Sequence, residues 1–130
     1  MKQTVSDTYN IAWFKLAECV SRGEKERALG VYRLLAHSLN DVAFATQLEG
    51  DILLSFSTQE ALAKYQQAAD SYIQSKRLFK AACVYEHMLA LNSHNTSYHE
   101  ILITLYTELH LNAKVEEHTA QLQAHTIIKK

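Results

Sequence analysis

The chain has 130 residues, no proline, three glycines and a net charge of −1. Glycine and proline supply most of the tight turns in β-sandwiches and barrels, so their scarcity argues against those folds. The glycines stand singly, at Gly23, Gly30 and Gly50, which excludes a glycine-rich phosphate loop. The near-neutral charge argues against a nucleic-acid binder, and two cysteines, Cys19 and Cys83, are too few for a disulfide framework.

Apolar residues recur at helical spacing along almost the whole chain, which predicts an all-α protein. Asn40–Asp41 is expected to stop one helix and cap the next, and the polar stretch Asn92–Asn95 is the clearest loop. The spacing predicts seven helices, in chain order at about residues 5–22, 25–39, 42–57, 58–74, 78–91, 96–110 and 114–125.

No membrane or export segment is expected. Residues 1–7 have no apolar core of the kind that a secretory signal carries. No run approaches the roughly 18 apolar residues that a membrane-spanning helix needs. Together with the two lone cysteines, this predicts a cytoplasmic protein that does not insert into membranes.

A small–aromatic–apolar motif repeats along the chain. Alanine is followed four residues later by tyrosine and after three more by an apolar residue in three of the helices, and a looser version with valine and threonine begins at Val115. The successive starts are 33, 20 and 34 residues apart. The three closer matches are Ala28, Tyr32 and Leu35; Ala61, Tyr65 and Ala68; and Ala81, Tyr85 and Met88.

This pattern resembles the tetratricopeptide repeat, a helix–turn–helix unit of about 34 residues. The best match is Tyr65, Ala68, Ala69 and Tyr72, and the likeness covers about residues 9–126. It implies one domain over residues 1–130, in which antiparallel helices stack as a right-handed superhelical solenoid. Repeats would lie at roughly 9–41, 43–75, 62–95 and 96–129, with the middle two sharing the fourth helix. The proline that ends repeats in this family is missing, and an unrelated helical bundle is the alternative fold.

The resemblance also implies a binding groove. In this family the first helix of each pair lines a concave surface that holds a peptide or helix of a partner protein. The positions that match it are Phe14, Glu18, Arg22, Gln47, Asp51, Leu54, Gln66, Asp70, Ile73, Ser97, Glu100, Thr104 and Glu108. Five carboxylates against one arginine favour a basic or apolar helical segment over an acidic C-terminal tail. The alternative is that these carboxylates form an ordinary solvated face.

We therefore expect a non-enzymatic adaptor, scaffold or chaperone-like module that needs no cofactor. Cys83 and His87 have the i, i+4 spacing of metal ligands, but no further motif completes a site, and Cys83 is expected to be a small packing residue. No metal site and no catalytic residue is predicted. The alternatives are a helical-repeat RNA-binding protein and, after it, a small enzyme.

Self-association through the first helix is a further hypothesis. Its aromatic residues are Tyr9, Trp13 and Phe14. The last two are about 100° apart around the helix, so they cannot both face one neighbour. Phe14 is expected to point into the groove or toward a partner. If that partner is a second copy of the chain, the first helix would form a homodimer.

Overall fold

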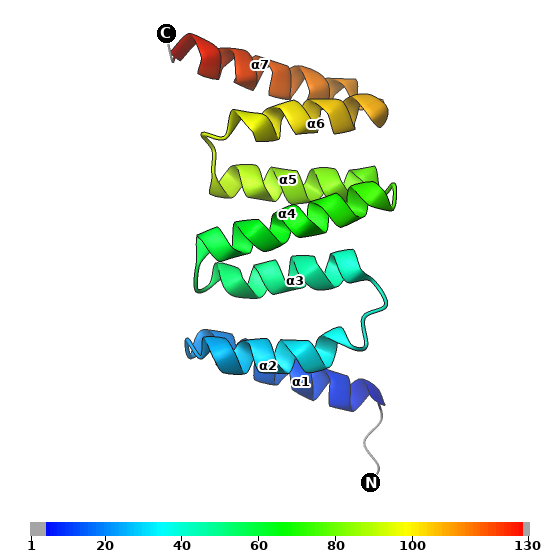
Figure 1. Ribbon diagram of the computed structural model, residues 1–130, viewed down its shortest axis with the longest axis vertical. Coiled ribbons are helices and arrows are strands. Elements are labelled where there is room, and N and C mark those ends of the chain that lie inside the picture. The colour runs from blue at the N-terminus through cyan, green and yellow to red at the C-terminus, as the bar shows by residue number, and fades with distance from the viewer. Residues whose placement is uncertain (1–4, 129–130) are drawn as a thin grey trace. The chain divides into compact units, whose positions relative to one another are not determined.

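The computed structural model describes the backbone of residues 5–128 and the side chains of residues 10–126, and this part of the chain contains helices and no strand. The predicted all-α class is thus confirmed, and consecutive helices within each compact unit run in alternating directions (Figure 1). The helices are α1 (Val5–Ser21), α2 (Lys25–Ala36), α3 (Val42–Leu54), α4 (Thr58–Gln74), α5 (Leu78–Leu91), α6 (Thr96–Glu108) and α7 (Asn112–Ile128).

Two helices end three residues earlier than the sequence predicts. Helix α2 ends at Ala36 instead of 39, and α3 ends at Leu54 instead of 57. The apolar pattern continues past both ends, because Leu39 and Phe56 are half-buried. Their backbone amides already bond three residues back, to Ala36 and Leu53, so the chain tightens into turns there.

Three joints share one left-handed geometry. Gly23, Lys76 and His110 have φ values of 72°, 62° and 60°. At each joint the next amide bonds five residues back: Glu24 to Cys19, Arg77 to Tyr72 and Leu111 to Tyr106. This is the Schellman arrangement, which ends α1, α4 and α6 without proline. The joints at Lys76 and His110 lie 34 residues apart, which is the length of the repeat.

The other three joints rely on side-chain caps. The Asp41 carboxylate accepts from the Phe44 amide at 3.2 Å, as the sequence predicts. Ser57 caps α4 by accepting from the Glu60 amide at 3.3 Å. Asn95 accepts from the Ser97 amide at 3.0 Å. Short polar side chains thus begin the helices that follow these joints.

The chain divides into two compact units on either side of the Lys64–Tyr65 bond, within α4. In the first unit α2 packs against α1 and α3, and the Tyr32 hydroxyl donates to the Ala45 carbonyl. In the second unit α6 packs against α5 and α7. The small and aromatic residues of the repeated motif in α2, α4 and α5 are all buried, which lets neighbouring helices approach closely.

One expectation about packing is wrong. Cys83 is exposed, so it is not a packing residue, whereas Cys19 is buried. In α7, Thr119 of the looser motif is half-buried, and its neighbour His118 is buried. No helix in the described part combines the length and apolar character needed to cross a bilayer.

Candidate functional site

The predicted binding residues of the first unit lie on α1 and α3, except for Arg22, which directly follows α1. Phe14 is 77% exposed. Glu18 and Arg22 form an exposed ion pair with 2.6 Å between carboxylate and guanidinium, so much of their charge is mutually neutralised. Asp51 is exposed. The remaining two, Gln47 and Leu54, are half-buried.

An apolar recess of about 370 Å³ opens between α1 and α3. We call it the α1–α3 recess; its lining is Trp13, Leu16, Ala17, Val20, Ser21, Leu48, Asp51 and Ile52. A second hollow along α1 shares Trp13 and Ala17 with it and adds Asn10 and Phe14. The structure therefore brings Phe14 and Asp51 to the edges of one largely apolar surface. Tyr9, the third aromatic of the dimer hypothesis, lies outside the described side chains.

The predicted residues of the second unit are held mostly by polar contacts among themselves. The Gln66 amide donates to the Asp70 carboxylate at 3.1 Å and is 2.8 Å from the Tyr85 hydroxyl. The Thr104 hydroxyl donates to the Glu100 carbonyl at 3.2 Å. Ser97 and Glu108 are exposed and Ile73 is half-buried. None of these residues lines the open cavity of the second unit.

That cavity has a volume of about 450 Å³ and lies where α5, α6 and α7 meet. Its walls combine imidazoles, carboxylates and short apolar side chains. The lining residues are Glu86, Leu89, Ala90, Ser93, His99, Glu117, His118, Gln121 and His125.

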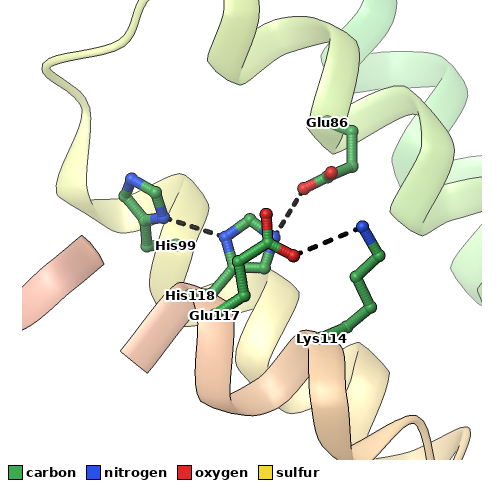
Figure 2. Close-up of polar contacts among 5 residues, drawn as sticks. All are labelled: Glu86, His99, Lys114, Glu117 and His118. Atoms are coloured by element: carbon green, nitrogen blue, oxygen red, sulfur yellow. Dashed lines mark hydrogen bonds and ion pairs between the residues drawn. The ribbon is translucent and has the colours of Figure 1, made fainter. Parts of the chain in front are cut away.

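Two buried histidines form the polar wall of this cavity, and we call them the histidine pair: His99 on α6 and His118 on α7. Their Nδ1 atoms lie 3.0 Å apart, and the two side chains are 3% and 2% exposed. Figure 2 shows His118 between His99 and Glu86, whose Oε1 lies 2.6 Å from His118 Nε2. These two atoms are close enough for an ion pair but miss the angular geometry of a hydrogen bond, and neither has another partner.

Burial sets the titration behaviour of this site. It lowers the pKa of His99, and the neighbouring His118 and His125 lower it further, while Glu86 opposes the shift. The Tyr106 ring stacks on His118 at 5.7 Å with 17° between the planes. Burial, followed by the nearby Glu86, raises the pKa of Tyr106 to about 12. The lowered pKa keeps His99 neutral at neutral pH, and the raised pKa keeps Tyr106 protonated there.

The sequence does not predict this pair, although it contains one signal. His99 precedes Leu102 and Tyr106 by three and seven residues, so it lies on the apolar stripe of its own helix. His118 similarly follows Val115 by three residues. Each histidine alone looks like an isolated polar residue on an apolar face. Their pairing depends on the α6–α7 register, which local spacing does not specify.

The spacing of Cys83 and His87 does not build a metal site. Cys83 is exposed, and the His87 ring packs 4.8 Å from the ring of Tyr65. Among the described residues, no three His, Cys, Asp or Glu side chains converge in a geometry that could hold a metal ion.

Comparisons with known proteins give one structural likeness to report. A solved structure described as the MamA RS-1 ArsTM double mutant has a TM-score of 0.49 and 14% identity, over 94% of this chain and 77% of that one. No protein-family model matches the chain. No curated protein matches it either. Function is therefore inferred from the residues of this chain alone.

Proposed function

We propose that this chain is a non-enzymatic protein-interaction module of the helical-repeat type, and that it binds an apolar segment of a partner protein in the α1–α3 recess. The buried alanines and tyrosines of α2, α4 and α5 support the resemblance to tetratricopeptide repeats. Such arrays bury their faces between successive helices and leave the outer face of the array for partners.

The joints support an assignment of the repeats. The Schellman turns at Gly23, Lys76 and His110 fall between α1 and α2, α4 and α5, and α6 and α7. The proposed repeats 9–41, 62–95 and 96–129 each contain one of these turns. In this assignment α4 is the first helix of its pair, and α3 is an added helix joined through the Ser57 cap.

The α1–α3 recess is the observation that carries the proposal. A surface with exposed Phe14 beside a hollow lined by half-buried Trp13 and Leu48 leaves large apolar side chains partly in water. Covering such a patch gains about 25 cal/mol for each Å² removed from water. Contiguous exposed apolar surface of this kind marks interaction sites on soluble proteins.

Charge favours one kind of partner. The exposed carboxylate of Asp51 lines the recess, and Glu18 is paired with Arg22. A basic residue beside the apolar side chains of a partner helix would meet the Asp51 carboxylate, and an acidic one would be repelled. The proposed ligand is therefore an amphipathic helix with basic flanks. The free thiols of Cys19 and Cys83 suit a reducing compartment, which supports a cytoplasmic setting.

Calorimetric titration with two synthetic helical peptides tests this function. One consists of leucine and lysine in an amphipathic pattern, and the other has glutamate in place of lysine. The lysine peptide should bind more tightly, and Asp51→Lys should remove that preference. Glu26→Lys, at an exposed position in the first turn of α2, should leave the preference unchanged. Equal binding of both peptides to the wild type would contradict the charge argument, and no binding of either would contradict the recess as the site.

A further inference from the structure

The described part of α7 is anchored by a single fully buried side chain. Between residues 112 and 126, His118 alone is buried, and the apolar Val115 and Leu122 are only half-buried. His118 is therefore the most deeply buried contact of α7 with the second unit. Its two ring nitrogens face His99 on α6 and Glu86 on α5.

The number of protons on the histidine pair decides whether this contact is attractive. A hydrogen bond needs one donor and one acceptor, so only one of the two facing Nδ1 atoms can carry a proton. When both rings are neutral, the Glu86 carboxylate favours a proton on His118 Nε2. His118 Nδ1 then accepts from His99 Nδ1–H, and every nitrogen in the contact has a suitable role.

One extra proton can also be accommodated. A charged His118 carries a proton on both nitrogens: its Nδ1–H donates to His99 Nδ1, whose own proton then lies on Nε2, and its charged ring forms an ion pair with the Glu86 carboxylate. A second extra proton has no such solution. It would place two N–H groups and two positive charges 3.0 Å apart in a buried setting, where like charges repel strongly.

The surroundings of the pair oppose that second proton. Burial, His118 and His125 all lower the pKa of His99, and Glu86 is the one contributor that raises it. Lys114 pairs with Glu117 at 3.3 Å, so this carboxylate is partly neutralised. Further titratable groups near the pair are Cys83 on α5, which acts electrostatically on Tyr106, and Tyr106 on α6, which stacks on His118. The ring of His94, in the α5–α6 loop, lies 6.5 Å from that of His125.

We propose that the histidine pair makes the attachment of α7 dependent on pH: α7 is held against α6 while His99 is neutral, and acidification below about pH 6.5 releases it. Release separates His118 from His99 and from Glu86, and it uncovers the Tyr106 ring that His118 stacks on. The sign follows from linkage, because the unfolded or detached state binds the second proton more readily than the docked state does.

Hydrogen exchange on the full chain at pH 7.5 and pH 5.5, corrected for the intrinsic effect of pH on exchange, tests this directly. The protection factors of α7 amides should fall by about threefold or more on acidification, whereas those of α2 in the first unit should not. His99→Asn keeps a polar group near the Nδ1 position and cannot titrate, so its α7 protection should be independent of pH. His110→Asn is the matched control, because His110 is exposed and asparagine tolerates its left-handed φ of 60°.

The proposal is wrong if wild-type α7 keeps its protection at pH 5.5, if α2 loses as much as α7, or if His99→Asn retains the pH dependence. Should His99→Asn fail to fold, NMR titration of the wild-type imidazoles replaces it. The His99 ring should then titrate below about pH 6.5, together with the shifts of α7 amides. A His99 titration that leaves the α7 amides unchanged would equally overturn the proposal.

Discussion

The Nδ1 atoms of His99 and His118 face each other 3.0 Å apart between two helices, with both rings buried. This contact joins residues 19 positions apart in the chain and sets the proton requirements of the α6–α7 packing. On the other side of the His118 ring lies the Glu86 carboxylate, which is the only partner of His118 Nε2 within the described structure.

The loss of unfolding free energy on replacing Glu86 should therefore depend on the side chain that replaces it. Glu86→Ala leaves a buried imidazole nitrogen without a partner and should lower the unfolding free energy by about 1–3 kcal/mol at pH 7.5. Glu86→Gln keeps an acceptor oxygen and should cost clearly less. Urea unfolding of the two variants measures the difference, and equal losses would show that the Glu86–His118 contact is not what stabilises α7.

The raised pKa of Tyr106 predicts that the folded protein loses stability at alkaline pH. Its pKa is raised to about 12 in the folded protein, against about 10 in an unfolded chain. The folded state thus keeps the phenolic proton where the unfolded state releases it. The stability gained from this is complete below about pH 10 and is lost as the pH rises through about 12.

Tyr106→Phe removes this contribution. The unfolding free energy of the variant should decline less steeply between about pH 9 and pH 11 than that of the wild type. Tyr32 and Tyr85 also have raised pKa values because of burial, so the slope should shrink without vanishing. An identical slope in wild type and variant would rule out Tyr106 as a contributor.

The Schellman joints predict opposite effects of glycine at different positions. Lys76→Gly and His110→Gly should each stabilise the protein by about 1 kcal/mol, because glycine adopts a φ near +60° without strain. Gly23→Ala should destabilise it by a similar amount, although a methyl group there meets no atom within 4 Å. Thermal unfolding measures each change.

Lys15→Gly is the control for that series, since it makes the same exchange on an exposed turn of α1. There glycine should cost about 1 kcal/mol, because it weakens a helix interior. Stabilisation by Lys15→Gly as well as by Lys76→Gly would mean that the left-handed joint is not the cause.

Replacing Gly30 should stabilise the protein. It lies within α2, and a methyl group added to it would meet nothing within 4 Å. Gly30→Ala should therefore raise the unfolding free energy by roughly 0.5–1 kcal/mol through helix propensity alone. A loss of stability in chemical denaturation would indicate that the position needs glycine for a reason beyond its own helix.

Much of the fold was predictable because it follows from local spacing. The alanines and tyrosines at Ala28, Tyr32, Ala81 and Tyr85 were expected in the core and are buried there. The cap at Asp41 followed from residue type and position. Such features depend on a few consecutive residues, which the sequence displays directly.

The candidate sites were predictable only in part. Phe14 was expected to face outward and does, but the recess beside it depends on how Leu48 of α3 meets Trp13 of α1. The histidine pair depends likewise on the register of α6 and α7. Residues far apart in the chain create these features, and no local pattern specifies which of their atoms will meet.

The recess carries the central claim, and the chain supplies its own reporter there, because Trp13 is the only tryptophan. Titration with the leucine–lysine helical peptide should shift Trp13 fluorescence to shorter wavelength and saturate, since binding removes the indole from water. Phe14→Asp should weaken this binding by about tenfold or more, while Leu34→Asp, on the exposed face of α2, should leave it unchanged. A Trp13 spectrum that does not respond to the peptide, or a response that Phe14→Asp leaves intact, would contradict the account.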